Sequence, residues 1–187
     1  MSWLSPPFPE RVTVDEITFV PLRPALVSVD FEAVMRDIPM LRAWSAQDWP
    51  TPEFTEAENL IDLERHDREQ QEGVALTYSL LLHGVVQGCL YVRPVADALI
   101  TRDVVVPTPL PLPLTDVVAR AWAHDISSTS LIASCASFLS SFQFPRLWWQ
   151  ANTDCPDQLA ACDALGWTHS LTFVGASATW VLRSVPE

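Results

Sequence analysis

Lysine is absent from this chain of 187 residues, and eleven arginines are its only strongly basic side chains. The absence excludes enzymes that hold pyridoxal phosphate through a lysine Schiff base. It also excludes nucleotide-binding loops in which a lysine reaches the terminal phosphates. Any phosphate that the protein binds must therefore be held by arginine, by hydroxyl groups or by backbone N–H groups.

Cysteine is scarce, and long apolar runs are missing. The four cysteines are Cys89, Cys135, Cys155 and Cys162. They form no Cys-x-x-Cys pair and no metal-site spacing, so we expect free thiols in a reducing compartment and no bound metal. The first nine residues lack the basic and apolar regions of a signal peptide, and no apolar run approaches the ~18–20 residues of a membrane span. We therefore expect a cytoplasmic protein without a membrane segment.

Acidic residues outnumber arginines by 23 to 11, which gives a net charge of -12 and a pI of about 4.6. This charge argues against a nucleic-acid partner, because phosphate neutralisation needs a basic surface. An acidic protein instead attracts cationic or amine-bearing partners. The charge is concentrated in residues 1–73, which contain fifteen acidic residues and six arginines, whereas residues 74–187 contain eight and five.

The amino-terminal segment is rich in proline, which separates its predicted elements. Residues 1–13 are expected to form an irregular arm, and residues 17–20 a short strand. Ser28 and Asp30 are candidate caps for a helix whose apolar residues follow helical spacing. Pro39 is expected to bend or restart that helix.

The next segment predicts a loop followed by a charged helix. Two tryptophans of the loop over residues 44–54, Trp44 and Trp49, either wall a pocket or fix the loop to the core. Residues 55–58 form a capping-box pattern, so a helix is expected to begin there. Its thin apolar stripe consists of Leu60, Ile61 and Leu63. We interpret residues 66–69 (His-Asp-Arg-Glu) as a solvated helix face, in preference to a metal or acid–base cluster.

The middle of the chain predicts a hairpin followed by a proline-rich insertion. Residues 75–82 and 85–92 read as two strands around the turn dipeptide His83-Gly84. Residues 94–114 contain a polyproline-type run, which suits either a stiff crossover or a segment that recruits a PxxP-reading domain. We favour the crossover, which would join two parts of one fold.

The second half alternates strands with helices. The expected elements are a strand over 117–122, a helix from about 127 to 142, a strand over 147–151, a helix between Pro156 and Gly166, and a strand pair over 171–174 and 179–182. No charge occurs between Ser127 and Phe144, so we expect the first of these helices to be covered on both sides. A strand–helix–strand crossover after an antiparallel hairpin indicates an α/β fold with a mixed sheet.

Three features, in this order along the chain, resemble the GNAT N-acetyltransferase superfamily, in the branch similar to ribosomal-protein N-terminal acetyltransferases. They are the hairpin with Gly88, the strand Arg120-Ala121-Trp122, and Asn152 followed by a helix that ends in Leu165-Gly166-Trp167. The resemblance implies one domain over residues 14–187, with a mixed sheet splayed between its fourth and fifth strands and flanked by helices. Acetyl-CoA would bind in the splay as co-substrate and pass its acetyl group to an amine.

The resemblance also implies where the cofactor would bind. Backbone groups of Trp122, Ala123 and His124 would be left unpaired by the splay and would hold the pantetheine arm in strand-like fashion. The following helix start would offer N–H groups, hydroxyls and a positive dipole end to the pyrophosphate. The residues of this helix start are Ser127, Ser128, Thr129 and Ser130.

Catalytic candidates each have a structural alternative. Asp116 is either a general base, placed at the start of its strand, or an exposed carboxylate at a strand end. Cys162 stands where the family has a tyrosine that is proposed to protonate the departing thiolate, or it is a packing residue. Asn152 hydrogen-bonds cofactor or substrate, or it has a turn role. His124 is a base or phosphate contact, or neither.

The expected activity is direct acetyl transfer to an amine-bearing small molecule or a peptide N-terminus. The alternative is a non-catalytic GNAT-like module for ligand binding or protein interaction, because residues 124–130 contain neither glycine nor arginine. A third hypothesis is a hydrolase that uses Cys162 with His169. The eight tryptophans leave room for a homodimer interface.

Overall fold

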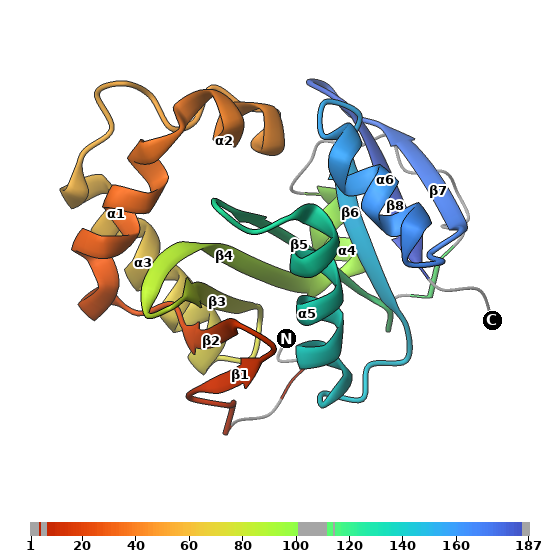
Figure 1. The fold of residues 1–187 in the computed structure, drawn as a ribbon, viewed down its shortest axis with the longest axis horizontal. Coiled ribbons are helices and arrows are strands. Elements are labelled where there is room, and N and C mark those ends of the chain that lie inside the picture. Colours follow the sequence, from red (N-terminus) through yellow and green to blue (C-terminus); the bar gives the residue numbers. More distant parts are fainter. Residues whose placement is uncertain (1–3, 5–6, 101–111, 114, 185–187) are drawn as a thin grey trace. The chain divides into compact units, whose positions relative to one another are not determined.

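The computed structural model describes residues 4, 7–100, 112–113 and 115–184. These residues form eight strands, six α-helices and one 3-10 turn (Figure 1). The elements are β1 (Val12–Val14), β2 (Ile17–Pro21), η1 (Pro24–Leu26), α1 (Val27–Arg36), α2 (Ile38–Ser45), α3 (Glu56–Gln71), β3 (Leu76–Leu82), β4 (Val85–Pro94), α4 (Val95–Ile100), β5 (Val117–Ala123), α5 (Ser128–Ser140), β6 (Leu147–Asn152), α6 (Pro156–Ala164), β7 (His169–Val174) and β8 (Thr179–Ser184).

The strands follow the order β1-β2-β3-β4-β5-β6-β8-β7 in one sheet. The pairs β1–β2, β2–β3, β6–β8 and β7–β8 are antiparallel, whereas β5 and β6 are parallel. The mixed sheet and the flanking helices confirm the predicted α/β class. No helix among the described residues is long and apolar enough to span a membrane.

The chain divides into two compact units. Unit 1 consists of Met1–Tyr91 and Ala121–Ile126, and unit 2 consists of Val92–Arg120 and Ser127–Glu187. Strands β4 and β5 each pass from one unit to the other along the chain.

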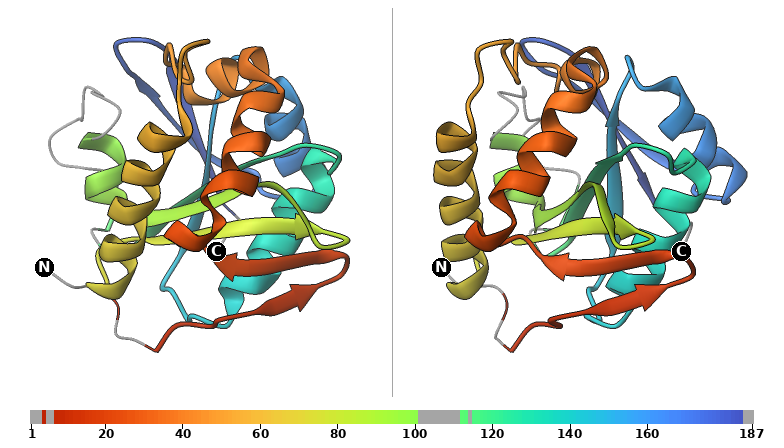
Figure 2. Two further views of the ribbon diagram at one scale, coloured as in Figure 1. Left: turned by 90° about the vertical axis from the view of Figure 1, so that its left-hand side faces the viewer. Right: turned by 60° about the vertical axis from the view of Figure 1, so that its left-hand side comes forward.

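In unit 1, helices α1, α2 and α3 pack beside the antiparallel strands. Helix α1 contacts α2 and α3, and α3 packs on β3; α1 (orange-red) and α3 (gold) lie side by side in Figure 2. Pro39 restarts the helix as predicted, because Asp37 caps α2 by accepting a hydrogen bond from Met40 N at 3.0 Å. The prediction that Ser28 or Asp30 caps α1 was wrong: the 3-10 turn η1 leads directly into Val27, and Asp30 lies buried within the helix.

Further boundaries in unit 1 differ from the sequence prediction. The irregular arm ends earlier than expected, because β1 pairs with β2 through Val12, Thr13 and Val14. Helix α2 extends through Trp44 to Ser45, so the predicted loop begins later. The capping box is present, but of the predicted apolar stripe only Leu63 is buried, whereas Ile61 is 67% exposed. The buried side consists of Asn59, Leu63, His66 and Gln70.

In unit 2, helices cover both faces of the sheet. Helix α4, which the sequence did not predict, packs Val95 and Leu99 into a core cluster with Val118, Trp148 and Leu182. Helix α6 packs on β6 and β8 and against α5. The proline-rich run lies almost wholly outside the described residues, so its predicted role stays a prediction.

Helix α5 is covered on one side only. Its apolar residues are buried, including Leu131, Ile132 and Phe138, whereas Ser137 and Ser140 are exposed. The prediction of cover on both sides was therefore wrong. On the exposed side, the Ser140 hydroxyl donates to its own helix at the Ser137 carbonyl (2.7 Å).

Candidate functional site

The parallel strands β5 and β6 separate soon after they begin. Their register in unit 2 runs from Val117↔Leu147 to Ala119↔Trp149, and among the described residues it ends there. Both strands continue, β5 to Ala123 and β6 to Asn152. The parallel pair confirms the predicted mixed sheet, while the splay stays a prediction.

The far end of β5 lies tightly against β4 within unit 1. A Cβ placed on Gly88 would come within 1.9 Å of the Trp122 carbonyl oxygen, so only glycine permits this approach. His124 N donates to the Gln87 carbonyl at 2.8 Å. The prediction that the backbone N–H of His124 is unpaired was therefore wrong. Because backbone groups alternate sides along a strand, Ala123 turns its N–H and C=O away from the edge that His124 uses.

The loop after β5 compensates for its lack of glycine. Asp125 adopts the left-handed conformation (φ 52°), which glycine favours and which aspartate tolerates. Its carboxylate forms an ion pair with Arg36 Nη2 at 2.5 Å, and Arg36 Nη1 donates to Gln87 Oε1 at 2.8 Å. The guanidinium of α1 thus neutralises the acidic charge of the loop. No local pattern in the sequence indicates this pair, whose members are 89 positions apart.

His124 is held by α1 as well. Its Nε2 lies 2.9 Å from the carbonyl oxygen of Ala33, so this nitrogen carries the proton and donates it. The ring lies edge-on to Trp122, with centroids 5.6 Å apart. His124 is buried, and these contacts hold the end of β5 against α1.

The amino terminus of α5 is capped by its own serine. Ser127 Oγ accepts a hydrogen bond from Ser130 N at 3.2 Å and donates to Ser130 Oγ at 2.9 Å. The N–H groups of Ser128 and Thr129 precede the first N–H that bonds to a helix carbonyl, that of Leu131, and point out of the helix end. Thr129 and Ser130 are exposed. The predicted pyrophosphate site therefore keeps two backbone donors, while the hydroxyl of Ser127 is engaged in the cap.

Asp116 is a buried residue, 3% exposed, and not an exposed carboxylate at a strand end. Its Oδ2 accepts a hydrogen bond from Trp148 Nε1 at 2.8 Å in unit 2. Asp116 also supplies the carbonyl that accepts from Val95 N, at the start of α4. These contacts favour a role in anchoring α4 and β6.

Asn152 is fully buried and forms a turn. Its Oδ1 accepts a hydrogen bond from Asp154 N at 2.8 Å, and its carbonyl accepts from Cys155 N at 3.1 Å. These hydrogen bonds shape the connection from β6 to α6. They favour the turn role that was considered for this residue.

Cys162 lies buried on α6, beside Arg183. Burial raises the pKa of its thiol to about 12, although Arg183 acts to lower it. Such a thiol is a weaker acid than an ordinary one at about 8.5, so protonating a departing thiolate from Cys162 would be unfavourable. The pairing with His169 is disfavoured too, because that exposed ring packs on Trp148 (4.9 Å between centroids).

Sequence reasoning missed a buried polar group in unit 1. Asp30, 2% exposed, accepts hydrogen bonds from Asn59 Nδ2 at 2.9 Å and Cys89 Sγ at 3.4 Å. The ring of Tyr91, two residues beyond Cys89 on β4, packs against the rings of Trp44 and His66, with centroids 5.7 Å and 5.4 Å away. Burial raises the pKa of Asp30 and that of Cys89. The available signal was the position of Asp30, three and four residues before the buried Ala33 and Val34 on the same helix face.

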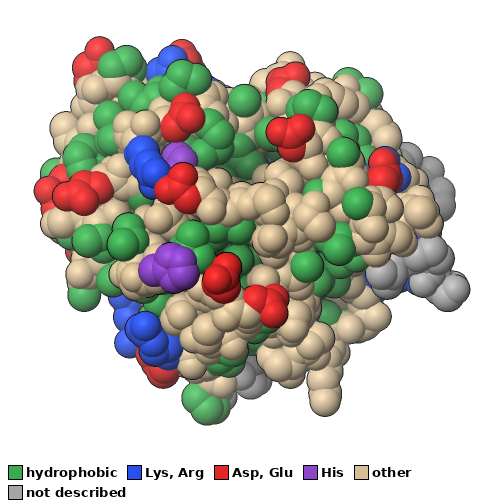
Figure 3. Space-filling model, viewed as in Figure 1, with side chains coloured by type: hydrophobic (Ala, Val, Ile, Leu, Met, Phe, Trp, Pro, Cys, Tyr) green, Lys and Arg blue, Asp and Glu red, His purple; other side chains and the backbone are tan. Residues whose placement is uncertain are grey.

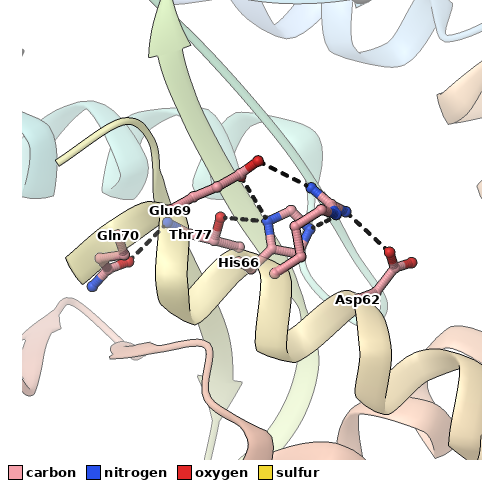
Figure 4. Close-up of polar contacts among 6 residues, drawn as sticks. Asp62, His66, Glu69, Gln70 and Thr77 are labelled. Carbon is pink, nitrogen blue, oxygen red and sulfur yellow. Dashed lines mark hydrogen bonds and ion pairs between the residues drawn. The ribbon is translucent and has the colours of Figure 1, made fainter. Parts of the chain in front are cut away.

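The charged segment of α3 is also more than a solvated face. His66 is 8% exposed, and its Nδ1 lies 3.1 Å from Thr77 Oγ1 on β3 (Figure 4). Its Nε2 lies 3.1 Å from Arg65 Nη2, and since arginine only donates, that nitrogen is the acceptor. Gln70 Oε1 accepts from Thr77 N at 3.0 Å. The solvated-face interpretation was therefore wrong for His66, which fastens α3 to β3.

Charged side chains do not gather into one dense patch on the face drawn in Figure 3, where acidic residues are scattered among hydrophobic and uncharged ones. The part of the chain that the structure describes contains no group of three or more His, Cys, Asp or Glu residues suited to a metal ion. The groups that these residues offer to a ligand are therefore backbone N–H groups, hydroxyl groups and arginine side chains.

No family model and no curated protein matches this sequence. Solved structures do match it. The ribosomal L7/L12 alpha-N-protein acetyltransferase RimL aligns with a TM-score of 0.65 at 14% identity, covering 94% of this chain and 93% of that one. The ribosomal-protein-S5-alanine acetyltransferase of Vibrio fischeri aligns with a TM-score of 0.65 at 10% identity, covering 93% and 94%. Mycobacterium smegmatis RimJ, in complex with a CoA disulfide, aligns with a TM-score of 0.64 at 14% identity, covering 90% and 81%.

These similarities extend over nearly the whole chain at low sequence identity. The chain therefore has the fold of the GNAT acetyltransferases, as the ordered sequence features predicted.

Proposed function

We propose that this protein is an acetyl-CoA-dependent N-acetyltransferase that transfers the acetyl group directly to an amine. The observation that carries the proposal is the end of β5–β6 pairing at Ala119↔Trp149 in a chain with the GNAT fold. Solved structures of that fold include RimL in complex with coenzyme A and RimJ in complex with a CoA disulfide. We further propose that residues 14–187 act as one domain.

The residues present suit coenzyme A despite the absence of lysine. The N–H groups of Ser128 and Thr129, at the positive end of the α5 dipole, would hold the pyrophosphate. The backbone of β5 around Ala123 would pair with the amide-rich pantetheine arm. The pairing of Arg36 with Asp125 supports this assignment, because it removes an uncompensated negative charge just before the proposed phosphate site.

Acetyl-CoA supplies an acetyl group that is activated as a thioester. The chain must bind the acceptor, remove a proton from its ammonium group, and present N–H groups to the oxygen on which negative charge develops. We propose a peptide N-terminus as the acceptor class. The ribosomal-protein substrates named for the similar structures support this choice, and so does a net charge of -12, which attracts ammonium groups.

Thermal unfolding with acetyl-CoA, with coenzyme A and without ligand tests cofactor binding. A ligand that binds only the native state raises the melting temperature, and a concentration of 100 Kd stabilises by about 2.7 kcal/mol. We expect a rise with both compounds, together with release of free thiol when amine-bearing peptides are added. No shift at millimolar acetyl-CoA would overturn the proposal. A shift without thiol release across a broad amine panel would favour a non-catalytic binding module.

A matched pair of variants on α5 tests the pyrophosphate position. Thr129→Glu places a carboxylate in the first helical turn, where it favours the helix but repels a diphosphate. Ser137→Glu places the same charge on the exposed middle of that helix. We expect at least tenfold weaker coenzyme A binding by calorimetry for Thr129→Glu, with little change for Ser137→Glu. Equal affinities would exclude the α5 amino terminus as the phosphate site.

A further inference from the structure

Strand β7 forms an open edge of unit 2. It stands at the end of the strand order, and among the described residues its one neighbouring strand is β8 (Figure 1). Of the six residues His169–Val174, Phe173 alone has a buried side chain, and Val174 is 65% exposed. One backbone side of β7 and most of its side chains are therefore accessible to a partner.

The hairpin between β7 and β8 shows which backbone groups lie on the open edge. Gly175 N donates to the Ala178 carbonyl at 2.9 Å, directly after the last paired residue of β7. In an antiparallel ladder, pairs that exchange hydrogen bonds alternate with pairs that do not. Counting back from Gly175, every second residue of β7 therefore lacks hydrogen bonds to β8. These residues are Ser170, Thr172 and Val174, and their N–H and C=O groups point outward along the edge.

The open edge carries no acidic residue and no arginine. The chain has none of these between Asp163 and Arg183, although its net charge is -12. Arg183 lies opposite Ser170 on β8 and forms an ion pair with Asp163 at 3.2 Å. Two copies of so acidic a protein repel each other. An uncharged edge is a surface at which they can approach without bringing carboxylates together.

Strand β1, at the other end of the strand order, has a different character. It contains only three residues, and the charged Arg11 and Asp15 stand directly before and after it. Short strands, charged residues and proline are the means by which proteins prevent their sheet edges from pairing. Strand β7 is twice as long and contains neither a charged residue of these kinds nor proline. Its edge is therefore suited to pairing, whereas that of β1 is protected against it.

We propose that β7 is the dimerisation edge of this protein and pairs in antiparallel fashion with β7 of a second copy. An interface between two identical surfaces has two-fold symmetry, so the three outward residues pair with themselves about the middle one. Thr172 lies opposite Thr172 of the second copy, and Ser170 opposite Val174. Each outward N–H and C=O group of these residues thereby gains a partner.

The same register extends the apolar core. On the other face of β7, Leu171 lies opposite Phe173 of the second copy. Phe173 belongs to a buried cluster of unit 2, and the partly buried Leu171 packs against that cluster. Apolar side chains that face each other across two strands stabilise the pairing. The two clusters therefore become continuous in the dimer, and Leu171 becomes more deeply buried.

Sedimentation of the natural protein from micromolar to millimolar concentration tests whether it dimerises. We expect a monomer–dimer equilibrium that shifts toward the dimer as salt is raised, because salt screens the repulsion between two acidic copies. A monomer at every concentration would overturn the proposal. So would a dimer that dissociates in salt, because it would be held by charged groups that β7 does not have.

Opposite charges at position 172 test the register. Thr172→Glu and Thr172→Arg each place two like charges opposite each other at the two-fold axis, and each should weaken dimerisation at least about tenfold. An equimolar mixture of the two variants places opposite charges there, so it should form a heterodimer. Thr13→Glu, at an exposed position of β1, is the matched control and should dimerise as the natural protein does. Thermal unfolding checks that all variants are folded.

Each result either supports or overturns the proposed interface. Dimerisation that Thr172→Glu leaves unchanged, or that Thr13→Glu weakens equally, would place the interface elsewhere. A mixture of the two Thr172 variants that stays monomeric would exclude the two-fold pairing at Thr172. These measurements need no acetyl-CoA, so their failure leaves the proposed acetyltransferase activity untouched.

Discussion

At Gly88, two backbone segments of unit 1 approach so closely that a side chain would not fit between them. A Cβ at this position would overlap the Trp122 carbonyl, whereas a Cβ on Gly84 meets nothing within 4 Å. Gly88→Ala should therefore lower the free energy of unfolding by at least ~2 kcal/mol, as steric strain in a core does. Gly84→Ala is the control, and it should cost only about 1 kcal/mol for its positive φ. Urea denaturation measures both, and equal losses would contradict the close approach of β4 and β5.

Asp30 makes stability depend on pH in a defined direction. Its folded-state pKa is raised, so the fold prefers the protonated carboxyl. That preference is fully present below the unfolded value of about 3.9 and is lost as pH rises through the folded pKa. Asp30→Asn should therefore match the natural protein near about pH 4 and gain a stability advantage toward neutral pH, ~1.4 kcal/mol for each unit of pKa elevation.

Denaturation at several pH values tests this prediction. The control is Asp48→Asn, because the Asp48 side chain is 92% exposed and pairs only with Arg42 at the surface. Its difference from the natural protein should not vary with pH in this way. A constant gap for Asp30→Asn would show that its carboxyl has an ordinary pKa in the fold.

At the scale of elements, helix α5 depends on its serine cap. Ser127 satisfies the backbone N–H of Ser130, so Ser127→Ala should lower the free energy of unfolding by about 1 kcal/mol. Ser137→Ala, on the exposed middle of the helix, is the matched control and should be neutral or slightly stabilising because alanine has the higher helix propensity. Similar effects of the two substitutions in chemical denaturation would argue against the cap.

The elements also show which sequence signals are reliable. The capping box at Thr55 and Glu58 forms as predicted, and the hairpin turn at His83 and Gly84 has positive φ at both residues, as its turn type requires. These signals act within a few residues, so the sequence contains all their partners. Helix α4 lacked such a signal and forms by packing Val95 and Leu99 on the sheet of unit 2.

For the whole molecule, the excess of acidic residues predicts a stability that increases with salt. The 23 acidic residues repel one another more than eleven arginines compensate, and raising ionic strength from about 0.01 M to 0.1 M shortens the Debye length from ~30 Å to ~10 Å. We expect the melting temperature to rise by several degrees over this range. Glu64→Gln combined with Glu72→Gln, both at exposed positions, should reduce the rise. A melting temperature that falls with salt would indicate that ion pairs dominate.

The sequence by itself determined most strands and helices in their order, except β1 and α4, together with several turns and caps between them, and through these the GNAT fold. Such features are local, because a cap or a tight turn needs partners only three or four residues away. Which side chains of a helix are buried was less predictable. Ile61 and His66 lie on the same charged helix, yet the apolar side chain of Ile61 is exposed and the polar one of His66 is buried. Side-chain type alone does not say which face of a helix meets the core.

Only the tertiary structure decided the candidate chemistry. Asp30 meets Cys89 across 59 positions, and Arg36 meets Asp125 across 89. Such pairs form because packed helices and strands bring distant residues together, at an entropic cost of loop closure that no local pattern records. The sequence shows the absence of lysine, but only the fold places Arg36 of α1 against Asp125 in the loop after β5, where it neutralises that carboxylate.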